Sequence, residues 1–173
     1  SKDIAKLALD FGAEVPFIRP DNLANDDSPE WLVWRHAIEY FDSHYKYKGV
    51  VVIPPTAPLR SDKDLINCIK KFENNDFDIV ITVSEANRSP FFNMVKIDDA
   101  GVTSLVNENY KITRRQDAPC VYDMTTVAYV VKSSFVRQKN HMFEGKVGSV
   151  QIPIERSIDI DTMLDFKIAE YLM

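Results

Sequence analysis

Residues 49–60 read GVVVIPPTAPLR, and the rest of the chain can be organised around them. The first five residues form a continuous apolar run rich in β-branched side chains, which is typical of a strand buried on both faces in a parallel sheet. Three prolines then fix φ and make the following connection, the proline loop (residues 54–60), rigid. Ligands of open α/β sheets bind beyond the carboxyl ends of strands, so this loop is a candidate site.

Strands and helices alternate on both sides of this run. Apolar residues at helical spacing predict four helices, at residues 4–11, 31–41, 65–72 and 162–172. Short apolar runs predict six strands, at residues 15–18, 49–53, 78–84, 92–97, 127–131 and 147–152. This alternation predicts one three-layer α/β domain over residues 1–173 with a mostly parallel sheet, interrupted by an irregular insertion.

Composition excludes several classes of protein. The 173 residues include 21 Lys plus Arg and 26 Asp plus Glu, a net charge of −5, which argues against a nucleic-acid partner. Apolar runs such as residues 50–53 are far shorter than the roughly twenty residues that span a membrane. Cys68 and Cys120 form no CxxC pair, so neither a zinc site nor a disulfide framework is expected, and a cytoplasmic location is the default.

Glycine is scarce in this chain. It has 5 glycines, where about twelve are typical for this length. Neither of the common glycine-rich phosphate loops occurs, and on that test alone the chain would not bind a nucleotide.

Three groups of polar residues remain after the core is assigned. In the proline loop, Thr56 offers a hydroxyl and Arg60 a cation; alternatively, Arg60 pairs with a local carboxylate in a merely stiff connection. The second group is residues 114–117, Arg-Arg-Gln-Asp, whose guanidinium groups suit bidentate binding of a carboxylate or phosphate. A solvated charged face is the alternative for this second group.

The third group is Asp159 and Asp161, which flank Ile160. Residues two apart in an extended segment point the same way, so both carboxylates would face one spot. Two converging oxygen ligands suit Mg²⁺, which takes one or two carboxylates together with substrate phosphates. The alternative is that Asp161 caps the terminal helix that follows.

The three groups together resemble the CMP-sialic acid synthetases, cytidylyltransferases that act on nine-carbon acidic sugars. The resemblance rests on the proline loop, on residues 114–117 with Tyr122 following, and on residues 157–161 before a closing helix, and it covers nearly the whole chain. It implies a Rossmann-like nucleotide-diphospho-sugar transferase fold and a homodimer. It also implies a reaction in which CTP and a sialic, legionaminic or pseudaminic type of acid give a CMP-sugar and pyrophosphate, with Mg²⁺.

The resemblance also implies roles for individual residues. Asp159 and Asp161 match the catalytic metal-binding pair of the family, and Arg115 and Gln116 match positions that serve the sugar acid or its activated phosphate. Thr56, Arg60 and Tyr122 are the remaining substrate-binding candidates.

The chain departs from the family pattern in three places. Pro54 stands where glutamine is usual, and residues 125–126 are Thr-Thr where Asn-Gly is usual, which leaves the particular sugar open. The basic glycine-rich loop that holds the CTP phosphates in the family has no counterpart here, so we expect the chain to be N-terminally incomplete. A non-catalytic fragment that folds and dimerises, and a cytidylyltransferase for the eight-carbon acid Kdo, are the alternative functions.

The insertion at about residues 91–131 is rich in aromatic and methionine side chains, and its sequence offers few helices to cover them. In the family this segment is a dimerisation arm. The residues expected on an interface are Phe91, Phe92, Met94, Tyr110, Tyr122, Met124 and Tyr129. The alternative is that the arm folds back over its own sheet.

Overall fold

The computed structural model describes residues 1–108 and 111–173, which divide into two compact units. Unit 1 comprises residues 1–50 and 132–144, and unit 2 comprises residues 51–131 and 145–173. Every candidate site residue of the sequence analysis lies in unit 2. No helix within the described ranges combines the length and the apolar character needed to cross a membrane.

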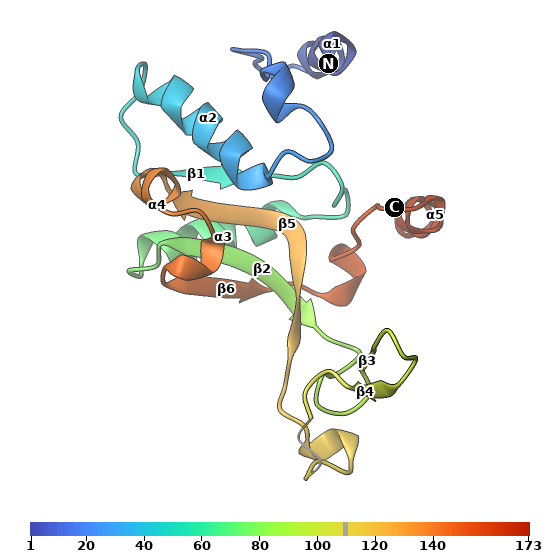
Figure 1. Ribbon diagram of the computed structural model, residues 1–173. Helices are drawn as coiled ribbons and strands as arrows, with labels where there is room; N and C mark the ends of the chain where they lie inside the picture. The colour runs from blue at the N-terminus through green and yellow to red at the C-terminus, as the bar shows by residue number, and fades with distance from the viewer. Residues whose placement is uncertain (109–110) are drawn as a thin grey trace. The chain divides into compact units, whose positions relative to one another are not determined.

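Unit 1 is helical (Figure 1). Its helices are α1 (Lys2–Asp10), α2 (Glu30–Asp42) and α4 (Ser133–Gln138), with 3₁₀ turns η1 (Asp21–Leu23) and η3 (Met142–Glu144). Helix α1 ends just before Gly12, whose φ of +83° is one that glycine adopts without strain. Three residues predicted for the core side of α2 are buried, namely Trp31, Trp34 and Ile38.

The strand predicted at residues 15–18 is wrong, because this segment is an irregular loop. The side chain of Phe17 packs on a helix and not in a sheet. The ring of Phe17 lies 4.8 Å from that of Tyr40 on α2, centroid to centroid, and the Tyr40 hydroxyl donates to the Pro16 carbonyl at 3.1 Å. A short apolar run is compatible with either environment, and here no strand partner is provided.

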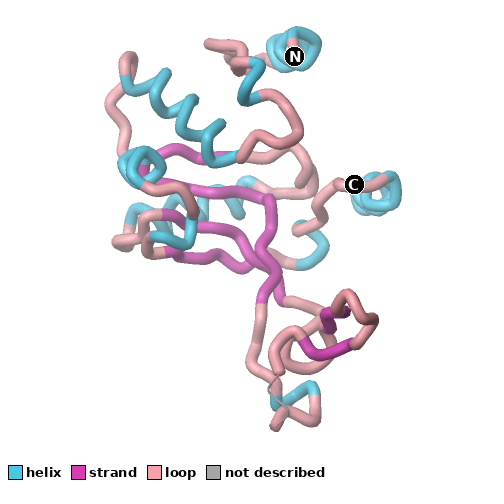
Figure 2. Tube along the Cα trace, viewed as in Figure 1, coloured by secondary structure: helices cyan, strands magenta, loops and turns pink. Residues whose placement is uncertain are grey.

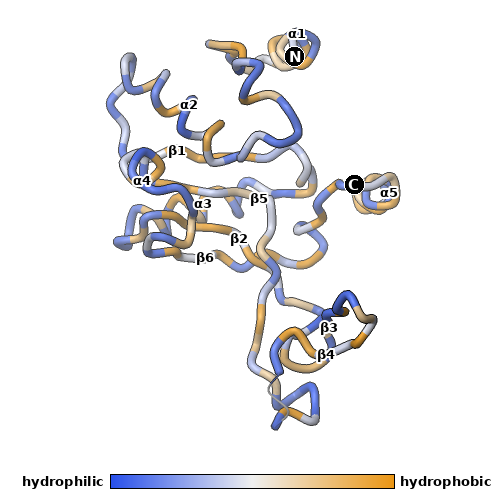
Figure 3. Tube along the Cα trace, in the orientation of Figure 1, coloured by the Kyte–Doolittle hydropathy of each residue, from blue (hydrophilic) through white to orange (hydrophobic). Residues whose placement is uncertain are grey.

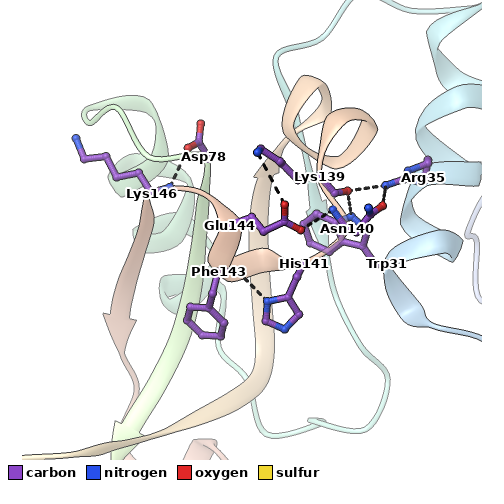
Figure 4. Close-up of polar contacts among 9 residues, drawn as sticks. All are labelled: Trp31, Arg35, Asp78, Lys139, Asn140, His141, Phe143, Glu144 and Lys146. Atoms are coloured by element: carbon purple, nitrogen blue, oxygen red, sulfur yellow. Dashed lines mark hydrogen bonds and ion pairs between the residues drawn. The ribbon is translucent and has the colours of Figure 1, made fainter.

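Polar side chains of α2 satisfy the end of α4 (Figure 4). The Trp31 indole N–H donates to the Lys139 carbonyl at 2.6 Å. The Arg35 guanidinium donates to the carbonyls of Val136 and Lys139 and to the Asn140 side-chain oxygen, at 3.0, 2.5 and 3.1 Å. These are the carbonyls that a helix C-terminus leaves without intrahelical partners.

Most of a four-stranded sheet with the order β1-β5-β2-β6 belongs to unit 2. The strands are β1 (Gly49–Val52), β2 (Ile79–Glu85), β5 (Tyr122–Lys132) and β6 (Val147–Gln151), and β2 is hydrophobic along most of its length (Figure 3). Strand β2 runs parallel to β6 but antiparallel to β5, so the sheet is mixed, with β5 as the reversed strand. The reason is that the chain leaves β2 into the insertion and re-enters β5 at the same edge, which reverses the strand direction.

Strand β1 is less buried than its sequence suggests. The expectation of burial on both faces is wrong, because the side chains of Val51 and Ile53 are 39% and 47% exposed. Strand β1 stands at the edge of the described sheet, where it has one neighbouring strand in place of two.

Helix α3 (Asp62–Glu73) covers part of the sheet in unit 2. Ser61 is its N-cap, as predicted, and Cys68 packs against Val80, Ala128 and Val130 of the strands. A Cβ atom at Gly148 of β6 would lie 2.6 Å from the Phe77 ring, so glycine permits this close approach. Helix α5 (Met163–Leu172) follows the 3₁₀ turn η4 (Ile154–Arg156).

The insertion carries a separate two-stranded antiparallel sheet, β3 (Val95–Ile97) with β4 (Thr103–Leu105), and a 3₁₀ turn, η2 (Arg115–Asp117). Figure 2 shows this hairpin outside the larger sheet. Met94, Tyr122 and Met124 are 41%, 51% and 49% exposed. Tyr129 is the exception, because it faces the core of the sheet and is 3% exposed, so its assignment to an exposed arm is wrong. Tyr110 lies outside the described residues.

Candidate functional site

Three strands of unit 2 meet at one edge of the sheet. Since β2 and β6 are parallel, Glu85 and Gln151 end at the same side. The antiparallel strand β5 begins there, with Tyr122 opposite Glu85. This is the edge at which open α/β sheets bind their ligands.

A pocket of about 600 Å³ lies at this edge. Polar and charged side chains on its walls come from the end of β2, the insertion and the end of β6: Glu85, Arg88, Ser89, Arg115, Gln116, Tyr122 and Gln151. A smaller pocket of about 400 Å³ adjoins it and shares Glu85, Ala86, Arg115 and Gln151. The predicted residues Arg115, Gln116 and Tyr122 are therefore brought together around one cavity.

The two arginines of residues 114–117 behave differently. Arg114 forms a two-point ion pair with Asp117, at 2.7 and 2.9 Å, and these hydrogen bonds raise the pKa of the Arg114 guanidinium. Arg115 donates through Nη2 to the Asn87 carbonyl at 2.8 Å. Within residues 1–108 and 111–173 this is the one hydrogen bond of its side chain, which leaves most of the five guanidinium donors for a ligand. The local, solvated role suits Arg114, and Arg115 remains the binding candidate.

The proline loop and the segment around Asp159 lie side by side. The Ile160 N–H donates to the Thr56 carbonyl at 2.9 Å, which joins the two segments through their backbones. Beneath this contact, Ala57 packs with Val127 and Ile152 in a fully buried cluster. The structure thus places Thr56 next to the two candidate metal ligands.

Among the described residues, no hydrogen bond or ion pair engages the carboxylates of Asp159 and Asp161. Asp159 Oδ1 is buried and has no hydrogen-bond partner among the residues that the structure describes. The N-cap of helix α5 is Thr162, whose side chain accepts from the Asp165 N–H at 3.3 Å while Asp165 accepts from the Thr162 N–H at 2.7 Å. The alternative in which Asp161 caps this helix is therefore wrong, and its exposed side chain is available to a ligand.

The Arg60 side chain forms a hydrogen bond within the proline loop. Its Nη2 donates to the Pro54 carbonyl, and burial lowers the pKa of its guanidinium. Its Nε is buried without a partner in the described part of the chain. No carboxylate pairs with Arg60 among these residues, so it is not the local ion pair considered as an alternative.

An ion pair that the sequence analysis missed anchors the segment before Asp159. Arg156 donates to both carboxylate oxygens of Asp64, at 2.8 and 3.0 Å, and the Ser61 N–H adds a bond at 2.9 Å. Burial alone would raise the pKa of Asp64, but the hydrogen bonds from Arg156 and Ser61 lower it overall. The spacing Ser61-x-x-Asp64 is that of a helix capping box and could have identified this carboxylate.

The predicted site residues thus form two groups at one edge of the sheet. Thr56, Arg60, Asp159 and Asp161 belong to the joined loops, whereas Arg115, Gln116 and Tyr122 line the pocket. Ile152 connects the groups, because it packs against Ala57 and also lines the smaller pocket.

Glu85, Arg88 and Gln151 of the pocket were missed from the sequence. The polar run 85–88 follows a buried strand directly, so the rule that selected the proline loop also selects this run.

The donor set fits a magnesium ion that is bound together with a nucleotide. The described residues contain no group of three or more His, Cys, Asp or Glu side chains placed to hold a metal by themselves. Mg²⁺ needs only one or two carboxylates when phosphate oxygens complete its coordination. The unpartnered oxygen of Asp159 and the exposed carboxylate of Asp161 meet that requirement.

Solved structures identify the fold. A CMP:2-keto-3-deoxy-manno-octonic acid synthetase complexed with CTP aligns with a TM-score of 0.64 and 8% identity, over 99% of this chain and 77% of that one. The 4-diphosphocytidyl-2C-methyl-D-erythritol synthase of Anaerococcus prevotii aligns with a TM-score of 0.63 and 14% sequence identity. This alignment covers 99% of this chain and 76% of that one. The fold is therefore the Rossmann-like fold of the nucleotidyltransferases, as expected.

Curated relatives define the family, although no family model matches the chain. It is 35% identical over 175 residues to the CMP-N,N'-diacetyllegionaminic acid synthase of Campylobacter jejuni and 34% identical to post-translational flagellin modification protein B of Campylobacter coli. Both alignments cover 100% of this chain and 74% of the relative. A pseudaminic acid cytidylyltransferase of C. jejuni is 26% identical over 172 residues, covering 99% and 74%. The chain belongs to the CMP-sialic acid synthetase family of cytidylyltransferases for nonulosonic acids, which confirms the resemblance seen in the sequence.

Proposed function

We propose that this protein transfers CMP from CTP to a nine-carbon acidic sugar of the legionaminic type and releases pyrophosphate. Family membership supports the reaction class. The observation that supports the assignment of its centre is the backbone hydrogen bond between Ile160 and Thr56, which joins the proline loop to the segment that carries Asp159 and its unpartnered oxygen.

In the proposed reaction the anomeric hydroxyl of the sugar attacks the α-phosphorus of CTP, and pyrophosphate leaves. Such a step depends on positioning and on charge neutralisation, and it needs no protein nucleophile. Asp159 and Asp161 would hold Mg²⁺. When bound, this ion would neutralise phosphate charge and favour deprotonation of the attacking hydroxyl. The rigid proline loop, braced by Arg60, would keep Thr56 and the Asp159 segment fixed relative to each other.

The pocket around Arg115 is proposed to bind the sugar acid. The free donors of Arg115 suit a carboxylate, because a guanidinium binds its two oxygens through parallel hydrogen bonds. Gln116 and Gln151 offer amide groups for sugar hydroxyls, and Tyr122 offers a ring and a hydroxyl. A pocket of about 600 Å³ is within the range of small-molecule sites.

The experiment that tests this function measures pyrophosphate release by the protein expressed from its complete reading frame. CTP and Mg²⁺ are combined in turn with N,N'-diacetyllegionaminic acid, pseudaminic acid, N-acetylneuraminic acid and Kdo. We expect turnover with the first acid to exceed turnover with the others. Activity with Kdo alone would favour the alternative enzyme, and inactivity with every acid would favour the non-catalytic alternative.

We also propose that the protein is a homodimer joined through the insertion. The support is exposed apolar surface on the hairpin, where Val95, Ile97 and Val102 are 56%, 68% and 62% exposed. Light scattering at micromolar concentration should then give twice the chain mass. Replacement of Val95 and Ile97 by lysine should produce a monomer, whereas a wild-type monomer would contradict the proposal.

A further inference from the structure

The pairing of β2 with β5 is interrupted in the middle of the sheet. Ile81 lies opposite Tyr129, but the next residue of β2, Thr82, lies opposite Thr125. Three residues of β5, numbers 126–128, therefore have no counterpart on β2. This is a bulge, and bulges bend a strand and change the direction of the side chains that follow.

The side chain of Thr82 lies inside this bulge and is fully buried. Its Oγ1 lies 3.1 Å from the Thr125 carbonyl and 3.2 Å from the Ala128 carbonyl, and its single proton can be donated to either. The same oxygen accepts from the Thr125 hydroxyl at 2.8 Å and from the Ala128 N–H at 3.3 Å. One hydroxyl thus satisfies backbone groups at both ends of the bulge.

The bulge separates two parts of β5 that lie in different environments. The residues after it, 129–131, are buried in the sheet. The residues before it, 122–124, are exposed, and Tyr122 lines the pocket. The position of Tyr122 over the pocket consequently depends on how the strand is bent between Thr125 and Ala128.

We propose that Thr82 is a positioning residue, which sets Tyr122 at the sugar-acid pocket by holding the bulge of β5. The proposal rests on the proposed function of that pocket. Thr82 itself does not line the pocket. Thr82 acts on Tyr122 through strand β5, because its hydroxyl forms the hydrogen bonds that hold the bulge.

The test compares two substitutions at this position. Thr82→Val keeps the shape of the side chain and removes the hydroxyl, whereas Thr82→Ser keeps the hydroxyl. We expect Thr82→Val to raise the KM for the sugar acid about tenfold, the factor that corresponds to one lost hydrogen-bonding group, with the KM for CTP unchanged. Thr82→Ser should restore the wild-type KM. Thr103→Val on the exposed strand β4 is the matched control.

A second readout is independent of activity. Cys120 is exposed, lines the pocket and lies two residues before Tyr122, whereas Cys68 is buried, which raises its pKa to about 11. A disulfide reagent at pH 8 should therefore label Cys120 selectively. We expect its labelling rate to change severalfold in Thr82→Val and to return to the wild-type value in Thr82→Ser.

The outcomes separate the proposal from its alternatives. A lower melting temperature in Thr82→Val, with unchanged KM and unchanged Cys120 labelling, would overturn it and leave a purely structural role. If the wild-type protein turns over no sugar acid, the proposed function fails, but the Cys120 rate still decides whether Thr82 positions this segment. If Thr82→Val does not fold, Thr125→Val takes its place, because it removes one donor to Thr82 and leaves the rest of the bulge intact.

Discussion

Arg35 in unit 1 and Arg115 in unit 2 use the same side chain in opposite ways. The Arg35 guanidinium donates hydrogen bonds to other residues of the protein, namely two carbonyls at the end of α4 and the side chain of Asn140. The Arg115 guanidinium donates one hydrogen bond, to the Asn87 carbonyl, and lines a pocket. The role of a polar side chain can therefore be inferred from how many of its donors and acceptors are already hydrogen-bonded within the fold.

The carboxylates of unit 2 divide in the same way. Asp64 is buried and is fully occupied by Arg156 and Ser61. Asp159 has an unpartnered buried oxygen, and the Asp161 side chain is exposed. We therefore expect substitutions of occupied groups to lower stability and substitutions of unoccupied groups to lower activity.

The largest effect is expected at Asp161. Asp161→Asn should lower turnover about a thousandfold, because a neutral amide is a poor ligand for Mg²⁺, with little change in melting temperature. Pyrophosphate release at saturating substrates is the measurement, and Asp99→Asn in the exposed hairpin turn is the control. Wild-type turnover in Asp161→Asn would remove the metal assignment.

The next effect separates the two neighbouring arginines. Arg115→Ala should raise the KM for the sugar acid about thirtyfold, which corresponds to the roughly 2 kcal/mol of a charged hydrogen bond. Arg114→Ala should change it less than about twofold, because Arg114 is already paired with Asp117 at the surface. Equal effects at both positions would contradict the division drawn between these residues.

A stability effect without an activity effect is expected in unit 1. Arg35→Ala should lower the free energy of unfolding by about 2 kcal/mol, because the carbonyls of Val136 and Lys139 lose a charged donor. Urea denaturation is the measurement. Arg19→Ala is the control, since the Arg19 side chain makes one exposed hydrogen bond within the described residues, to the Leu23 carbonyl. This substitution should lower the free energy of unfolding by less than about 0.5 kcal/mol.

The smallest effect concerns acid stability. The pKa of Asp64 is lower in the folded protein than its ordinary value of 3.8, so the unfolded chain binds more protons around that pH. The stabilisation is complete well above pH 3.8 and is lost as the pH falls through the folded pKa. Between pH 6 and pH 3 the free energy of unfolding of Asp64→Asn should therefore fall less than that of the wild type; parallel curves would show that this ion pair contributes nothing to acid sensitivity.

Much of the fold follows from local patterns in the sequence. The cap at Ser61, the buried strand after Asp78 and the aromatic face of α2 were predictable because each pattern has a single physical interpretation. The run at 15–18 was not, because four apolar residues pack equally well on a helix or in a sheet. The direction of β5 was also hidden, since it depends on where the insertion returns to the sheet.

The candidate site was partly predictable for the same reason. The strand-end rule located the proline loop, and the same rule would have located Glu85 had it been applied to β2. It could not show that Thr162, and not Asp161, caps α5, because both residues are good caps and their geometry decides between them. The pairing of Arg156 with Asp64, 92 residues apart, has no local signal at the arginine.

The arm leaves the sheet after Glu85 and re-enters it at Tyr122, and these two residues face each other on adjacent strands. The residues between Glu85 and Tyr122 therefore form one closed loop, because the sheet holds its two ends together. The cost of closing such a loop rises only with the logarithm of its length, by about 0.6 kcal/mol for each doubling. The arm can therefore lengthen, shorten or be exchanged during evolution with little change in the stability of the sheet from which it extends.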